Sequence, residues 1–203
     1  AAGDWFGRSV AVDGGTVVVG ADDDDDGGTD SGSAYIFRTD DGGATYGQVA
    51  KLTASDAAAG DNFGWAVAID GDTVVVGAWR DADAGTDSGS AYVFRTTDGG
   101  ATYGQVAKLT AADAAQWDNF GSSVAIDGDT IVIGASSDDD GGSYSGSAYV
   151  FRTTDGGATY VEVAKLTAAD AAKYDHFGVS VAIAGGVVVI GADEDGNSGT
   201  GAY

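Results

Sequence analysis

The fold of this chain is decided by the stretch from residue 63 to residue 78, FGWAVAIDGDTVVVGA, because its landmarks recur along the sequence. The Phe-Gly pair begins at Phe6, Phe63, Phe120 and Phe177, and the Gly-Ala pair begins at Gly20, Gly77, Gly134 and Gly191. The triplet Lys-Leu-Thr begins at Lys51, Lys108 and Lys165. Every interval is 57 residues. A constant period of this length is the signature of a repeat architecture, so we expect three complete units and a shorter fourth.

One unit contains four segments with the character of short strands. Within the unit that starts at Phe63, these segments are Ala66–Ile69, Thr73–Ala78, Ala91–Arg95 and Tyr103–Thr110. Asp-Gly turns separate the first two and the last two, and the Val-rich second segment is apolar without alternation, as in a strand covered on both faces. Four-stranded units repeated at constant period predict an all-β fold of β-propeller blades, about three and a half in this chain, with antiparallel strands in chain order.

The repeat also divides the chain. We treat residues 1–203 as a single propeller segment with blades at about 5–61, 62–118 and 119–175 and a partial blade at 176–203. Three and a half blades do not close a ring, and unpaired strand edges favour association with other strands. We therefore expect the chain to be part of a longer polypeptide, or to be completed by its neighbours.

Composition excludes several classes of function. With 9 Lys and Arg against 32 Asp and Glu, the net charge is −23, which repels nucleic-acid phosphates and anionic lipids. The absence of Cys excludes disulfides and thiolate chemistry within the chain, and its one His excludes a multi-histidine metal site. No apolar run approaches the roughly 18 residues of a membrane span, so we expect neither nucleic-acid binding nor membrane insertion.

The sequence of landmarks resembles a known repeat. Phe-Gly, an apolar strand, Val-Gly-Ala and Gly-Ser-Ala-Tyr-Val-Phe are similar to the FG-GAP repeat of integrin alpha-subunit propellers. The resemblance is greater to the FG-GAP-type repeats of secreted bacterial and algal proteins, which also carry an Ala-Lys-Leu-Thr-Ala strand and an Asp-rich loop after Gly-Ala. It implies an extracellular propeller used for adhesion or ligand binding, often with calcium in its loops. The integrin calcium loop, however, corresponds here to connections as short as Asp70-Gly71-Asp72, so that site is not carried over.

The acidic residues are concentrated in the loop that follows Gly-Ala. Asp-x-Asp followed by Gly supplies carboxylates and a turn, which suits a hard cation such as calcium. The predicted metal ligands are Asp24, Asp26, Asp81, Asp83, Asp138, Asp140, Asp193 and Asp195. The alternative is that Asp and Gly only shape tight, solvated turns. A second recurring acid, represented by Asp61 and Asp118, stands two residues before each Phe and is interpreted as a turn or capping residue.

Other chemistry-bearing residues are weak candidates for catalysis. His176 falls at a position held by Asn119 and Asn62 in earlier units, and the repeated serines have no motif that places a base beside them. Tryptophans differ from these residues because none recurs with the period. Unrepeated aromatics such as Trp65, Trp79 and Trp117 indicate surface contacts with sugar or protein, or simple divergence between blades.

We therefore predict a non-catalytic, extracellular or cell-surface binding and adhesion module with calcium-stabilised loops and a protein or glycan ligand. The alternative is a structural repeat subunit of a surface fibre or filament, in which further copies of the same repeat are the partners. An enzyme is disfavoured because no unit stands out as exceptional.

Overall fold

The computed structural model of the protein describes residues 3–193, which form fourteen β-strands and no helix. The first sheet contains β1 (Val10–Asp13), β2 (Thr16–Ala21), β3 (Ser33–Arg38) and β4 (Gly47–Leu52). The second contains β5 (Ala66–Asp70), β6 (Thr73–Ala78), β7 (Ser90–Arg95) and β8 (Gly104–Leu109). The third contains β9 (Phe120–Asp127), β10 (Thr130–Ala135), β11 (Ser147–Arg152) and β12 (Val161–Leu166). Two described strands, β13 (Ser180–Ala184) and β14 (Val187–Gly191), form the fourth.

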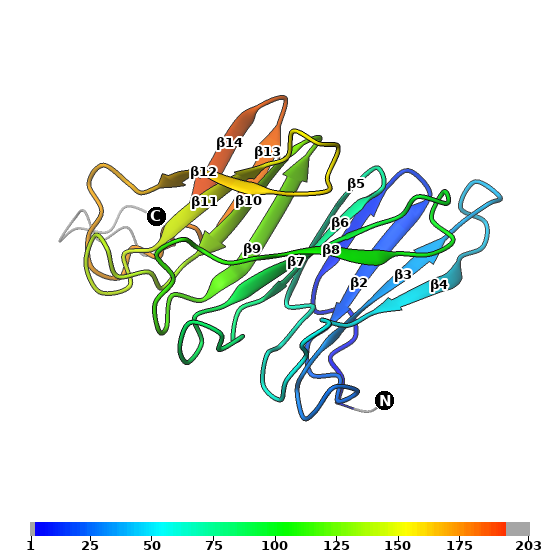
Figure 1. Cartoon of the computed structure of the whole chain (residues 1–203), viewed down its shortest axis with the longest axis horizontal. Coiled ribbons are helices and arrows are strands. Elements are labelled where there is room, and N and C mark those ends of the chain that lie inside the picture. The colour runs from blue at the N-terminus through cyan, green and yellow to red at the C-terminus, as the bar shows by residue number, and fades with distance from the viewer. Residues whose placement is uncertain (1–2, 194–203) are drawn as a thin grey trace.

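Each sheet is one blade of a propeller. All strand pairs are antiparallel and follow chain order, from β5 through β6 and β7 to β8 in the second blade. The blades lie next to one another in chain order (Figure 1), and their first strands β1, β5, β9 and β13 are in contact from blade to blade. The predicted four-stranded antiparallel units and their order are thus confirmed. Within the described part of the chain there is no helix with the length and apolar character that crossing a membrane requires.

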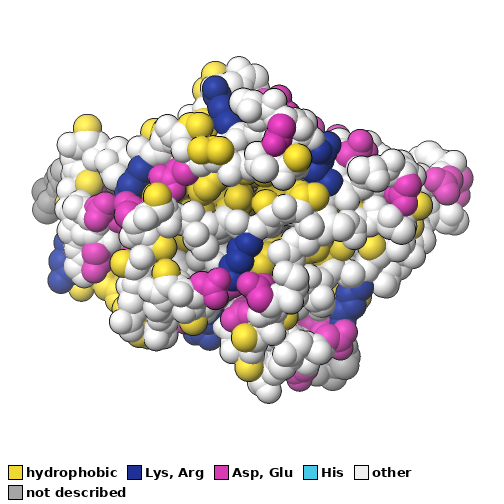
Figure 2. Space-filling model, in the orientation of Figure 1, with side chains coloured by type: hydrophobic (Ala, Val, Ile, Leu, Met, Phe, Trp, Pro, Cys, Tyr) yellow, Lys and Arg dark blue, Asp and Glu magenta, His cyan; other side chains and the backbone are white. Residues whose placement is uncertain are grey.

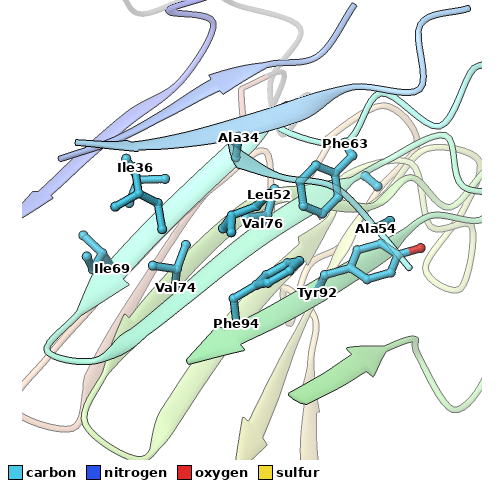
Figure 3. Packing of buried hydrophobic residues seen from close by; sticks show 12 residues of the cluster. Ala34, Ile36, Leu52, Ala54, Phe63, Ile69, Val74, Val76, Tyr92 and Phe94 are labelled. Atoms are coloured by element: carbon cyan, nitrogen blue, oxygen red, sulfur yellow. The ribbon is translucent and has the colours of Figure 1, made fainter. Parts of the chain in front are cut away.

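The hydrophobic core lies between blades, because each blade has two different faces. Tyr92 and Phe94 on β7 point toward the first blade, whereas Val93 between them points toward the third. Figure 3 shows the first of these interfaces, where Phe63, Tyr92 and Phe94 face residues of the preceding sheet. The Phe63 ring meets the Tyr92 ring edge-on at 5.4 Å between centroids. Every residue of β6 is buried, as expected for a strand covered on both faces.

Glycine is required where successive blades touch. The backbone N–H of Gly64 donates to the carbonyl of Gly77 at 3.0 Å within the second blade, and Gly64 has a left-handed φ of 97°. A Cβ atom on Gly77 would overlap the carbonyl oxygen of Gly121 in the third blade. The glycine of each Gly-Ala pair therefore lies against the glycine of the Phe-Gly pair in the next blade. This close backbone contact is repeated at every interface between described blades, which we call a seam.

Candidate functional site

The predicted metal loops lie at the seams between blades. The loop after β6 runs beside the segment that enters β9, where Asn119 N–H donates to Asp87 O at 3.1 Å and Phe120 N–H donates to Ser88 O at 3.0 Å. The loops after β2 and β10 make corresponding bonds to the next blade. Any group held by these loops would therefore stand against both blades.

In the second blade the loop carboxylates surround a lysine. The Nζ of Lys108, on β8, lies 2.9 Å from Asp81 Oδ2 and 2.7 Å from Asp56 Oδ2, and it also bonds Asp83. The Tyr92 hydroxyl donates to Asp81 Oδ2 at 2.5 Å or to Asp56 Oδ1 at 2.9 Å. Asp81 is only 3 % exposed. We call these five residues the lysine cluster of this blade.

Electrostatics within the cluster favour the charged forms of Asp56 and Lys108. Burial raises the pKa of Asp56, but hydrogen bonds from Lys108 and Tyr92 outweigh it and hold that pKa below its ordinary value. Burial lowers the pKa of Lys108, but its bonds to the three carboxylates raise that pKa above the ordinary range. Burial and the neighbouring Asp81 carboxylate raise the pKa of Tyr92, which stays a phenol. The cluster is thus an ammonium ion held by carboxylates.

The third blade repeats this arrangement, and the first blade repeats it with two acids instead of three. In the third blade, Lys165 Nζ lies 2.8 Å from Asp113, 2.9 Å from Asp138 and 2.5 Å from Asp140. In the first blade, Lys51 Nζ lies 3.0 Å from Asp24 and also bonds Asp26. In the fourth blade, Asp193 Oδ1 lies 3.0 Å from His176 Nδ1. Asp195 lies outside the described residues.

The donor set of the second blade suits a cation. One carboxylate oxygen each from Asp56, Asp81 and Asp83 lies within 4.8 Å of the others, so this group can hold a metal ion. Carboxylates are the ligands that calcium prefers. The ammonium of Lys108 is, however, already bonded to all three. A metal ion at this point and the lysine therefore compete for the same oxygens.

Sequence reasoning placed the loop acids together but missed the lysine, the tyrosine and the third acid. The signal was present in the recurrence of Lys108 and Tyr92, which also face each other in register across β7 and β8. Figure 2 shows the wider pattern, in which acidic side chains gather beside Lys or Arg at several places on one face. Each lysine therefore offsets one of the negative charges gathered around it.

A different kind of site lies between the first two blades. A pocket of about 330 Å³ opens beside the loop after β2 and the start of β5. It is lined by aromatic and charged side chains: Trp5, Arg8, Asp22, Asp23, Asn62, Trp65, Trp79 and Arg80. We call it the tryptophan pocket.

The side chains of the tryptophan pocket are stacked in a row. Trp65 and Trp79 have ring centroids 5.1 Å apart at a tilt of 51°. The guanidinium carbon of Arg8 lies 3.6 Å from the Trp65 centroid, and that of Arg80 lies 4.5 Å from the Trp79 centroid. Cation–π contacts of this kind stabilise both partners and fix the arginines in place.

Two polar atoms of the pocket are buried without a partner. Asp22 Oδ1 and Trp79 Nε1 have no hydrogen bond within residues 3–193. Asp22 is 3 % exposed, and its burial raises the pKa of its carboxyl group. Nearby, Asn62 Nδ2 donates to Asp22 O and to Asp23 Oδ1, both at 3.1 Å, which ties the two blades together. Both atoms are buried, so a ligand in the pocket reaches them only when the side chains that cover them move.

The pocket concentrates residues that depart from the repeat. Six of the nine basic residues recur with the period, as Arg38, Arg95 and Arg152 and as Lys51, Lys108 and Lys165. Arg8 and Arg80 do not recur, and both line the tryptophan pocket. Three of the four tryptophans line it too. Trp65 and Trp79, for which the sequence suggested surface contacts, both line this pocket, whereas Asp22 and the arginines were not predicted.

The recurring acid before each Phe acts as a turn residue. Asp61 Oδ2 accepts from Ala58 N–H, and Asp118 Oδ2 accepts from Ala115 N–H, each at 2.7 Å. This agrees with the predicted capping role. His176 packs edge-on against Tyr144 at 6.1 Å between centroids, and its Nδ1 atom lies 3.0 Å from Oδ1 of the exposed Asp193.

These features define a repeat protein built from β-propeller blades with recurring lysine clusters. The family model described as FG-GAP repeat matches residues 1–37, 46–94, 103–151 and 160–203. The chain therefore belongs to the FG-GAP repeat family, as its motifs predicted. No curated protein matches it. Among solved structures, Sqt1 from Saccharomyces cerevisiae is similar, with a TM-score of 0.49 and 11% identity over 81% of this chain and 37% of that one. The chain thus spans little more than a third of the length of that protein.

Proposed function

We propose that the protein is a non-catalytic, extracellular or cell-surface binding module whose ligand, a glycan or a protein, occupies the tryptophan pocket. The family and fold indicate a binding or structural module. The resemblance to secreted repeats supports a role outside the cell.

One observation carries this assignment. On a frame in which most side chains recur every 57 residues, three tryptophans and two arginines that do not recur lie around one pocket. Recurring residues serve the packing and polar contacts that every blade needs. Residues that do not recur are not needed for the packing common to all blades. Where several of them lie together, they are the residues available to bind a ligand.

The test is a ligand screen read out at the indole groups. The chain has four tryptophans, and single Trp→Phe variants assign their indole N–H resonances. Sugars, amino acids, organic acids and short peptides are added at millimolar concentration. We expect at least one chemical class to shift the Trp65 and Trp79 signals, to leave Trp117 unshifted and to be recovered unchanged. If no class shifts these signals, the pocket is not a binding site, and turnover of a ligand would refute the non-catalytic role.

Calcium stabilisation of the loops is a separate part of the proposal. The acidic group of Asp56, Asp81 and Asp83 supports it. Binding requires that the Lys108 ammonium leave these carboxylates. Unfolding curves of the wild-type chain with calcium and with a chelator test it, and identical curves would remove calcium from the function.

A structural role is the second candidate, and the end faces of the array favour it. Phe6 is 57 % exposed, whereas its counterparts Phe63 and Phe120 are fully buried against a preceding blade. At the other end, Val187 and Val189 of β14 are 66 % and 63 % exposed. The two faces correspond to the two sides of an internal seam. Copies of the chain joined by such faces would form an open, head-to-tail array, as a filament requires.

Sedimentation at increasing protein concentration tests the structural role. Phe6→Asp and Val189→Asp change opposite ends, and we expect either one to abolish association. Val163→Asp is the matched control, because Val163 is 54 % exposed but lies on the outer strand β12. A wild-type chain that stays monomeric at all concentrations excludes self-assembly.

A further inference from the structure

The tryptophan pocket holds one acceptor and one donor that the protein itself does not satisfy. Asp22 Oδ1 and Trp79 Nε1 are buried and lack partners among the described residues, although most buried polar atoms in proteins are hydrogen-bonded. Leaving such atoms unpaired lowers the stability of the fold. A hydroxyl group can donate to a carboxylate and accept from an indole N–H. A ligand rich in hydroxyl groups can therefore satisfy both atoms once the side chains that cover them move aside.

The charge of the pocket disfavours ionic ligands. Arg8 and Arg80 are balanced by Asp22 and Asp23, so the lining has no formal net charge. The chain as a whole carries −23, which repels an anion at a distance. A cationic ligand would be repelled by the guanidinium groups of Arg8 and Arg80, which lie on Trp65 and Trp79, and Arg8 is also 5.8 Å from the Trp5 centroid. A neutral ligand avoids both costs.

The size and surface of the pocket match a single sugar ring. Its volume of about 330 Å³ is at the small end of ligand pockets, which span roughly 300–1,000 Å³. Trp5 lines the opening and remains 61 % exposed. An open indole offers an apolar plane on which the C–H face of a pyranose can lie, while the hydroxyl groups at the ring edge reach polar side chains.

We propose that the tryptophan pocket binds one pyranose unit of a neutral saccharide, with Asp22 accepting from a sugar hydroxyl and Trp79 donating to a sugar oxygen. This inference rests on the proposed binding function and names its ligand class. The edges of the Arg8 and Arg80 guanidinium groups supply further donors around the same ring. Their stacking on indoles holds them in place before the ligand arrives, which reduces the entropy lost on binding.

The test uses the whole chain and four probes: methyl β-D-glucopyranoside, methyl α-D-mannopyranoside, glucuronate and inorganic phosphate. Binding is followed through the Trp65 and Trp79 indole signals, with a mixture of short peptides as a fifth addition. We expect a neutral pyranoside to shift these signals and the anions to leave them unchanged. Asp22→Asn keeps the shape of the side chain but weakens the acceptor, and we expect about a tenfold loss of affinity or more. Trp79→Phe removes the N–H group and should weaken binding several-fold.

Controls separate binding from folding. Trp117→Phe changes a 49 % exposed tryptophan that does not line the pocket, and it should leave affinity unchanged. Because Asp22 Oδ1 is unpaired, Asp22→Asn should unfold at the same or a higher urea concentration than the wild type, which a structural role for Asp22 would not produce. If Asp22→Asn does not fold, Trp79→Phe decides alone.

The outcomes distinguish this inference from the function on which it rests. If peptides, glucuronate or phosphate shift the two indole signals and the neutral pyranosides do not, the saccharide assignment is wrong and the binding module stands. If no probe shifts them, both fail. A neutral pyranoside that binds Asp22→Asn and Trp79→Phe as tightly as the wild type would also overturn the proposed contacts.

Discussion

Replacing Lys108 by Met removes the central cation of a lysine cluster while keeping an aliphatic chain beside Tyr92. The Asp81 side chain is 4 % exposed, so it is left as a buried carboxylate without its ammonium. Breaking a buried ion pair by removing one partner costs about 3–5 kcal/mol. The Tyr92 hydroxyl and the Asp83 N–H still bond Asp81, which places the effect toward the lower end. Asp56 and Asp83 are 44% and 59% exposed, and such exposed pairs contribute no more than about 1 kcal/mol each.

We therefore expect Lys108→Met to lose about 3 kcal/mol of unfolding free energy, which equilibrium urea denaturation at neutral pH measures directly. Lys173→Met is the control, because it removes the same charge from an exposed lysine that lies over Tyr174 instead of in a carboxylate cluster. Calcium should restore part of the loss in Lys108→Met, since the three carboxylates are then free, and a concentration 100 times its Kd returns about 2.7 kcal/mol. A loss below about 1 kcal/mol, or one equal to that of Lys173→Met, would show that the cluster does not stabilise the seam.

Three other substitutions test the seam glycine, a buried acid and the phenol. Gly77→Ala should lower the free energy of unfolding in urea by about 1–3 kcal/mol, because its Cβ meets the Gly121 carbonyl. Gly104→Ala is the control and should not change that free energy, because Gly104 has open space around it and no left-handed φ. Equal effects of the two substitutions would contradict the seam contact. Burial raises the pKa of Asp118 to about 6, so the folded state binds a proton more tightly than the unfolded chain, and stability falls as the pH rises from about 4 to about 6. Asp118→Asn should therefore gain up to about 2 kcal/mol relative to the wild type between those pH values, and parallel stability curves would refute this. Tyr92→Phe leaves Asp81 and Asp56 with one hydrogen-bond donor fewer, and we expect the free energy of unfolding to fall by about 1–2 kcal/mol without a change in the calcium response. An unchanged urea midpoint would show that the phenol is dispensable.

The fold could be predicted from sequence because its determinants are periodic. Two strands and a tight turn recur within each unit, and the landmark glycines Gly77 and Gly121 recur because every seam repeats one backbone contact. Strand boundaries followed the apolar segments to within a few residues. What the local sequence did not supply was the partner of each loop acid. Asp81 and Lys108 are brought together only by the pairing of β6, β7 and β8, so a pattern of acids alone suggested an external cation.

The tryptophan pocket brings together equivalent positions of the first two units. Arg8 and Trp65 hold the same position in neighbouring units, and they stack on each other; Asp22 and Trp79 share another position and line the same pocket. A residue near the first strand of one blade lies close to the equivalent residue of the next blade, because the first strands of neighbouring blades are in contact. When two neighbouring units both carry a non-recurring residue at such a position, the two residues therefore lie beside each other. Neither Trp65 nor Trp79 belongs to the core clusters between blades, so the chemistry of this pocket can vary without loss of blade packing.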